Sequence, residues 1–308
     1  QNPKLVGYNA IMTHHVQSSG FLGGPWWGGS YDWVHPGTRA GNSLLFAAAA
    51  GLGLSVNLHL GELLHLGFEG TGSDSFAQAI SDYKGECVPL DPTDAERAHI
   101  AAALRTVLPE LAPHASLRDV SLQDWPYSVF TRRNLEDFRA ATGAAVVPSP
   151  LYVENIQSLL AGGPERLRQW GDWACAARFR FHQWLLAELR AFRPDLTLAL
   201  SRYWDHGLIT LYLGYDAIPG AERQALRAAG LDTYAAFLRF MGYDSARYAG
   251  QSGVSLELET CARLRTGKEL PDYYETDWFR QLRRDFAAGG LNIMVSFALL
   301  ESENPLLS

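Results

Sequence analysis

The stretch LRDVSLQDWPYSVFTRRNLEDFRAATG, residues 117–143, contains a short apolar run followed by a longer amphipathic segment. We predict a strand over 120–123, where apolar and β-branched residues lie between polar ones. A helix is predicted over 130–142, because Leu135 and Phe138 stand between charged neighbours and Gly143 can end the helix. The two elements form one strand–helix unit.

The same alternation continues on both sides of this unit. Further apolar runs predict strands at 5–12, 54–60, 196–203, 233–240, 254–259 and 291–299. Helices are expected from Pro92 onward, over 164–192 and over 273–288, with Thr93 or Asp94 as the cap of the first. Strands that alternate with helices are typical of a parallel α/β fold.

Composition limits the classes of function. The chain has 308 residues, of which 47% are hydrophobic and 19% charged, so it can bury a large core, as one α/β barrel or two smaller domains. Its net charge of −7, without any run of Lys or Arg, argues against nucleic acid and anionic membranes as partners. No stretch approaches the roughly 20 apolar residues of a spanning helix.

Residue usage also excludes several cofactors. Only Lys4, Lys84 and Lys268 are lysines, and none stands in a context suited to Schiff-base chemistry. The three cysteines lie far apart without a CxxC pair, so we expect neither a disulfide framework nor a thiolate metal site. The sequence therefore predicts no cofactor and no metal.

The C-terminal third carries a second informative stretch, SLELET at 255–260. Alternation places Ser255, Glu257 and Glu259 on one face of a strand and two leucines on the other. Together with 117–138 and the run at 291–299, it resembles the (β/α)8-barrel glycoside hydrolases of the clan that includes the barrel β-galactosidases. The resemblance implies a single catalytic barrel over 1–308, whose first strand lies upstream of Gln1.

The resemblance also implies two catalytic carboxylates at strand ends. Glu259 matches the nucleophile of strand seven, with Glu257 as the second choice. Asp124 matches the general acid/base of strand four, although the clan usually has Asn-Glu where this chain has Gln123-Asp124. An indole at Trp125 would desolvate Asp124 and raise its pKa, as a proton donor requires. We expect cleavage of an O-glycosidic bond in an oligo- or polysaccharide with retention.

Polar and aromatic residues near the other predicted strand ends are candidates for binding a sugar. Aromatic rings cover the apolar face of a pyranose while polar neighbours bind its hydroxyls. The candidates are Asn9, Trp26, Trp27, His59, Glu62, Trp125, Arg202, Tyr203, Trp204 and Asp205. The expected partner is a saccharide, which favours an extracellular or periplasmic location over a cytoplasmic one. The sequence indicates no oligomeric state.

Two other functions stay open at this point. A metal-dependent barrel hydrolase, such as a deacetylase, would use residues drawn from His14, His15, His59, His65, Asp205 and His206, although neither HxH nor HExxH occurs. A carbohydrate-binding barrel without catalysis would explain Gln123-Asp124 in place of Asn-Glu. The paired glutamates argue against it, because a binding groove needs no buried carboxylate pair.

Overall fold

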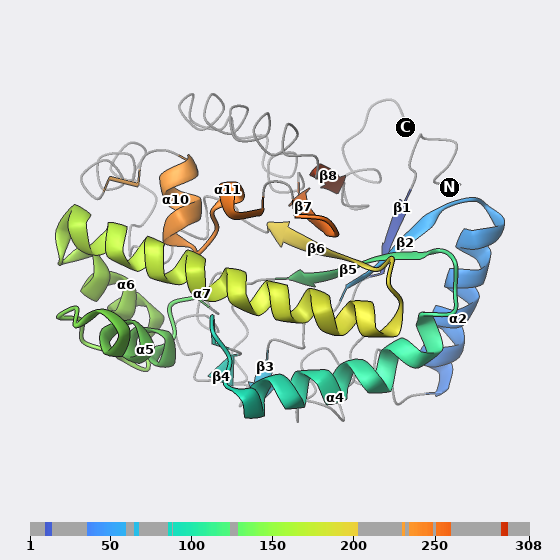
Figure 1. Cartoon of the computed structure of the whole chain (residues 1–308), viewed down its shortest axis with the longest axis horizontal. Helices are drawn as coiled ribbons and strands as arrows, with labels where there is room; N and C mark the ends of the chain where they lie inside the picture. The colour runs from blue at the N-terminus through green and yellow to red at the C-terminus, as the bar shows by residue number, and fades with distance from the viewer. Residues whose placement is uncertain are drawn as a thin grey trace, which may run out of the picture. The chain divides into compact units, whose positions relative to one another are not determined.

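The computed structural model describes residues 10–13, 36–59, 65–67, 86–87, 89–123, 129–202, 230–231, 234–248, 251–259 and 291–294 (Figure 1). The chain divides into two compact units: residues 1–124 with 180–200, and residues 125–179 with 201–308. The expectation of one domain over 1–308 stays a prediction.

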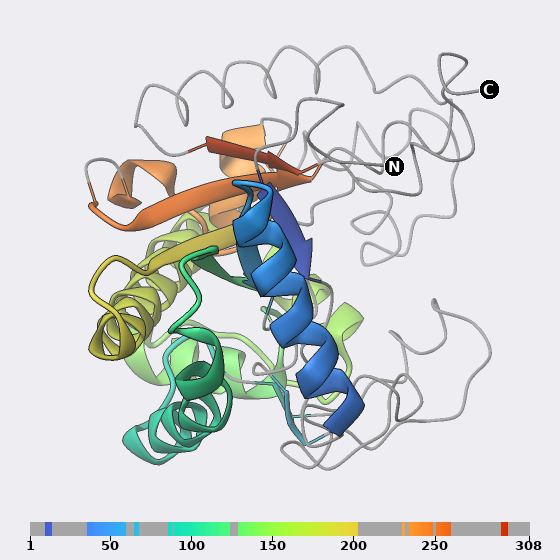
Figure 2. The same cartoon turned by 90° about the vertical axis from the view of Figure 1, so that its right-hand side faces the viewer.

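The first unit combines parallel strands with helices. Its elements are β1 Ala10–Thr13, α2 Pro36–Gly51, β2 Ser55–His59, β3 His65–Gly67, β4 Glu86–Cys87, α4 Asp94–Leu111, β5 Leu117–Gln123, the end of α7 Gly163–Phe192, and most of β6 Thr197–Arg202. β1 is parallel to β2 and β2 to β5, while β6 follows β5 in the sheet. Helix α2, in blue, runs alongside these strands in Figure 2. The predicted α/β fold with parallel strands is confirmed.

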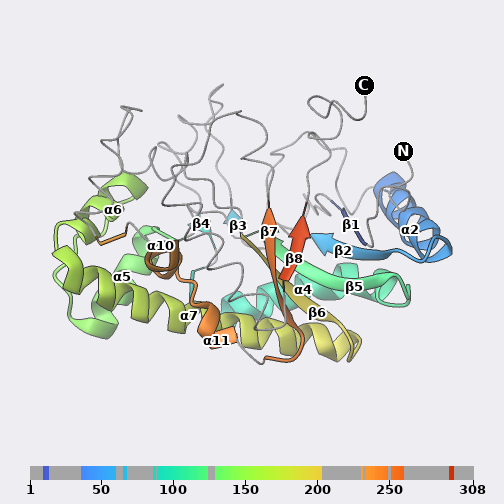
Figure 3. The same ribbon diagram turned by 90° about the horizontal axis from the view of Figure 1, so that it is seen from above.

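Both faces of β2, β5 and β6 are buried over most of their described lengths, as in parallel sheets generally. One face of β2 carries Val56 and Leu58, each 0% exposed, and the neighbouring face of β5 carries Val120. Figure 3 shows β2 and β5 side by side. Apolar residues of α2 and α4 complete this core, among them Phe46 and Leu108.

The second unit contains α5 Arg132–Thr142, α6 Tyr152–Leu160, the first part of α7, α10 Tyr234–Phe240, α11 Ser245–Tyr248, β7 Val254–Glu259 and β8 Leu291–Met294. β7 and β8 are parallel. The rings of Phe130, Phe138, Trp170, Trp173 and Phe240 form its aromatic core, with Phe130 4.8 Å from Phe240 and Trp170 5.3 Å from Phe138 between centroids.

Several helices begin or end where the sequence predicts, at residues whose side chains or backbone conformation can cap a helix. Thr93 and Glu96 form a reciprocal capping box at α4, and the Thr131 side chain accepts a hydrogen bond from the Asn134 backbone N–H at α5. Gly143 ends α5 with φ of 70°, a conformation that costs glycine little.

One predicted strand is wrong. Residues 234–240 of the run 233–240 form helix α10. A short apolar run fits either element, and here tertiary contacts favour the helix: the Trp170 side chain donates to the Phe240 carbonyl, and Arg239 pairs with Asp172 and Asp244. Of the other predicted elements, 5–9, 295–299 and the helix 273–288 lie outside the described residues.

Candidate active site

The structure describes the backbone of four predicted site residues. His59 ends β2, Arg202 ends β6, and Glu257 and Glu259 lie in β7. The remaining candidates lie outside the described residues: Asn9, Trp26, Trp27, Glu62, Asp124, Trp125, Tyr203, Trp204 and Asp205. Of the histidines in the metal alternative, His65 begins β3, and His14, His15 and His206 lie outside the described residues.

Strand β7 carries the two candidate carboxylate residues at its carboxyl end. Glu257 is in register with Asn292 and Glu259 with Met294 of the parallel strand β8. Two residues along a strand advance about 6.6 Å and return to the same face. Glu257 and Glu259 therefore share a face, and Glu259 is the last residue of β7.

Strands β2 and β5 bring a second set of polar residues to the carboxyl edge of the first unit. His59 is in register with Ser121, and β5 continues to Gln123, directly before Asp124 in the chain. Because parallel strands end at the same edge, the segment that begins with Asp124 leaves from the side where β2 ends. In α/β proteins this edge is where ligands bind.

A row of buried polar residues leads toward that edge. Asn57 is in register with Asp119, and both are less than 10% exposed, while Ser121 is fully buried. The Thr197 hydroxyl donates to a carboxylate oxygen of Asp119, which ties β6 to β5. Burying a polar group costs free energy of folding unless the group is hydrogen-bonded. This polar face of β2 and β5 therefore differs from their opposite face, which carries Val56, Leu58 and Val120.

Sequence reasoning missed part of this row. It did not single out Asp119, Ser121 or Thr197. The signal was present in β5, where Asp119, Ser121 and Gln123 alternate with Val120 and Leu122. Extending the predicted strand from 120 back to Leu117 would have revealed this period.

A surface hollow of about 660 Å³ lies at the opposite end of the strands. Its walls include Ser55 and Leu117, the first residues of β2 and β5, together with Arg118 and Arg193. In parallel α/β sheets ligands bind beyond the carboxyl ends of the strands, and this hollow lies at the amino-terminal ends. We therefore assign no ligand to this hollow.

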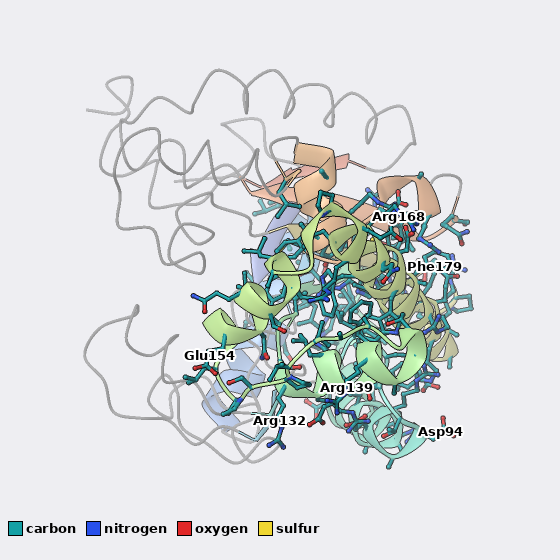
Figure 4. All side chains as sticks on the ribbon, turned by 90° about the vertical axis from the view of Figure 1, so that its left-hand side faces the viewer. Asp94, Arg132, Arg139, Glu154, Arg168 and Phe179 are labelled. Atoms are coloured by element: carbon teal, nitrogen blue, oxygen red, sulfur yellow. The ribbon has the colours of Figure 1, made fainter. Side chains whose placement is uncertain are left out.

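Several exposed charges of the second unit form surface ion pairs. Arg168 of α7 contacts Glu165 at 2.6 Å and Asp172 at 3.1 Å, and Figure 4 shows it among the side chains of α7. The hydrogen bond to Arg168 lowers the pKa of Glu165, and its counterpart raises the pKa of Arg168. Such solvated pairs contribute little to stability and belong to no candidate site.

One thiol in this unit has a strongly altered acidity. Burial raises the pKa of Cys175 to about 12, and its Sγ lies 3.6 Å from the Arg239 carbonyl oxygen. A thiol that stays protonated at neutral pH is a poor nucleophile. Cys175 is therefore a packing residue.

The described part of the chain contains neither a metal-ligand cluster nor a membrane-spanning helix. There, no three side chains of His, Cys, Asp or Glu form a group that could hold a metal ion. No described helix is long and apolar enough to span a membrane.

Comparison with known proteins gives one structural likeness of interest. No protein-family model matches the chain, and no curated protein matches it. Among solved structures, the chain is similar to the PgaB (BpsB) glycoside hydrolase domain from Bordetella bronchiseptica, with 14% identity and a TM-score of 0.36. The match covers 84% of this chain and 75% of that one.

Proposed function

We propose that this protein is a glycoside hydrolase that cleaves an O-glycosidic bond with two carboxylates. Glu259 is the nucleophile and Asp124 the general acid/base, with Glu257 beside the nucleophile. The observation that carries the proposal is the place of Glu259 as the last residue of a parallel strand, with Glu257 on the same face. Catalytic residues of α/β barrels stand at such strand ends.

The proposed chemistry follows from the charge that develops on the sugar. Asp124 protonates the leaving oxygen while the Glu259 carboxylate attacks the anomeric carbon and forms a glycosyl-enzyme. Water then hydrolyses this intermediate, with Asp124 now accepting its proton. Retention requires the two carboxyl groups to stand about 5 to 5.5 Å apart. We propose that the strands close into a (β/α)8 barrel, which would bring both carboxyl groups to one pocket.

The proposed sugar contacts come from the loops that follow the strands. Trp26, Trp27, Trp125 and Trp204 would stack on sugar rings, and His59, Glu62, Arg202, Tyr203, Asp205 and Asn9 would bind hydroxyl groups. Within the described residues, support comes from the polar row Asn57, Asp119 and Ser121, which runs toward the end of β2.

A panel of aryl glycosides tests the function. We expect the unaltered protein to hydrolyse at least one glycoside in the presence of chelator, Glu259→Gln to lower kcat by about 10³-fold or more, and Asp124→Asn by about 10²- to 10⁴-fold. Glu136→Gln, on the exposed face of α5, is the matched control and should keep full activity. Thermal melting of each variant checks folding.

Four results would contradict the proposal or one of its residue assignments. Activity abolished by chelator would favour a metal-dependent hydrolase. Saccharide binding without hydrolysis would favour a binding barrel. Full activity in a folded Glu259→Gln variant would remove the nucleophile assignment, and loss in Glu257→Gln alone would move that role to Glu257.

A further inference from the structure

A fully buried serine lies beside the last residue of β2. Ser121 of β5 is 0% exposed, and its register partner on the parallel strand β2 is His59. Neighbouring strands lie about 4.8 Å apart, and residues in register on parallel strands share a face of the sheet. Both residues belong to the first unit. A buried hydroxyl group is therefore level with a candidate sugar-binding residue at the carboxyl edge of the sheet.

On its other side Ser121 has an apolar neighbour. The Thr197 hydroxyl of β6 donates to Asp119 of β5, so these two residues share a face of the sheet. Two residues further along each strand the same face is reached again, at Ala199 and Ser121. Ala199 is 0% exposed and has no polar group in its side chain. Of the two neighbours of Ser121 across these described strands, only His59 is of a residue type whose side chain forms hydrogen bonds.

The same-face neighbours of Ser121 along its own strand are further away. Asp119 and Gln123 each lie two residues from it, which is about 6.6 Å along a strand. The Asp119 carboxylate also accepts from Thr197. Buried hydroxyl groups are hydrogen-bonded in folded proteins. The placement of Ser121 therefore favours His59, about 4.8 Å away between the strands, as its partner.

We infer that Ser121 is a positioning residue for His59, and the consequence of this for sugar binding rests on the proposed function. A hydroxyl group can donate or accept a hydrogen bond, and a neutral imidazole has one donor and one acceptor nitrogen. The partner of one nitrogen determines which of the two carries the proton. Ser121 thereby selects one tautomer of His59 and leaves the other nitrogen for a substrate hydroxyl group. Ser121 itself is fully buried and touches no reacting atom.

The tautomer of His59 provides a test that needs no substrate. We expect one tautomer to predominate in nitrogen NMR spectra of the labelled, unaltered protein at about pH 8.5, where a histidine of ordinary pKa is neutral. Ser121→Ala removes the hydroxyl group and should change the tautomer ratio by about three- to tenfold, the equivalent of one hydrogen bond. The His59 signals are assigned as those absent from His59→Gln. An unchanged ratio in a folded Ser121→Ala variant would overturn the inference.

Ser116→Ala is the matched control. Ser116 directly precedes β5 and is 4% exposed, and its hydroxyl donates to the Phe46 carbonyl at 2.7 Å. The change removes a buried hydroxyl group near the start of β5, so it should leave the His59 tautomer ratio as it is. An equal change in both variants would assign the effect to a general loosening of β5 and would overturn the inference. If Ser121→Ala does not fold, Ser121→Cys, which is similar in size and forms only weak hydrogen bonds, replaces it.

Kinetics test the consequence for sugar binding. A hydrogen bond made equally in the bound substrate and in the transition state affects KM and leaves kcat unchanged. We expect Ser121→Ala to raise KM for the hydrolysed glycoside by about three- to tenfold, with kcat changed less than about twofold. His59→Gln should raise KM at least as much, and the double variant no more than His59→Gln alone. Additive effects would show that Ser121 acts independently of His59 and would overturn the inference.

The two measurements separate this inference from the proposed function. If no glycoside is hydrolysed while the tautomer ratio changes in Ser121→Ala alone, the proposed function fails and the positioning of His59 by Ser121 stands. If a glycoside is hydrolysed but the ratio is unchanged in Ser121→Ala, the proposed function stands and the inference fails.

Discussion

The Arg193 side chain donates hydrogen bonds to backbone carbonyls of a segment that is distant in sequence. Its guanidinium donates to the carbonyls of Ala112 and His114, both at 2.9 Å, and to that of Leu117. Ala112 is the C-cap of α4, where helix carbonyls lack intrahelical partners. Asp195, at 2.6 Å from Nε, balances the charge. Arg193 therefore joins the end of α4 to the start of β5.

Replacing Arg193 tests this role at the residue scale. Arg193→Ala leaves three carbonyls without their charged donor, so we expect the free energy of unfolding to fall by about 2 to 4 kcal/mol. Arg118→Ala is the matched control, because Arg118 is exposed and lines the surface hollow that Arg193 also lines. This variant should change the free energy of unfolding by less than about 0.5 kcal/mol. Urea unfolding followed by circular dichroism measures both. Equal losses of unfolding free energy in the two variants would show that Arg193 contributes through its charge and not through its hydrogen bonds to the three carbonyls.

At the scale of elements, α7 and α10 are held together by polar and aromatic contacts. The Trp170 indole N–H donates to the Phe240 carbonyl at 2.7 Å, and a side chain added at Gly171 would meet the Arg239 carbonyl oxygen at 3.4 Å. This close approach lets α10 pack directly against α7. The run 234–240 also contains two alanines, a leucine and an arginine, which are good helix formers, so its composition and its neighbours both favour the helix.

Trp170→Phe should weaken this pair of helices. The change removes the indole donor from a buried carbonyl and leaves unfilled volume, so we expect a loss of about 2 to 4 kcal/mol in the free energy of unfolding. Trp173→Phe is the matched control, because Trp173 is only half-buried in the same cluster, and it should cost about 1 kcal/mol. Guanidinium unfolding provides the measurement. If both variants lost a similar amount of unfolding free energy, the buried aromatic surface, and not the indole hydrogen bond, would be what stabilises this pair of helices.

At the scale of the whole molecule, net charge predicts which partners are disfavoured. A net charge of −7 repels polyanions, because nucleic acids bind mainly through cationic contacts to phosphate. We expect no saturable change in the fluorescence anisotropy of a labelled DNA duplex at low salt, with a basic DNA-binding protein as positive control. Binding that weakens linearly with the logarithm of salt concentration would disprove this expectation.

The sequence by itself predicted the elements whose signals are local. Strand 254–259 has the predicted bounds, and both Thr93 and Gly143 mark helix ends as expected. Alternation also placed Glu257 and Glu259 on one face. These features depend on the period of a few neighbouring residues and on single capping bonds, so they can be inferred without the fold. Helix α2 was missed, because its alanine-rich run was not recognised as helical.

Only the tertiary structure determined the features that join distant residues. The register of Asn57 with Asp119, the packing of α10 against α7 and the side-chain hydrogen bonds of Asn155 and Arg193 each pair groups from separate parts of the chain. In the sequence, nothing distinguishes Asn155 from other polar residues of a helix. Its role as a hydrogen-bond donor is visible only in the folded chain, where Phe130 and Ser149 lie beside it. The physical reason is that a buried carbonyl must find a donor wherever the folded chain supplies one, and sequence distance carries no information about that.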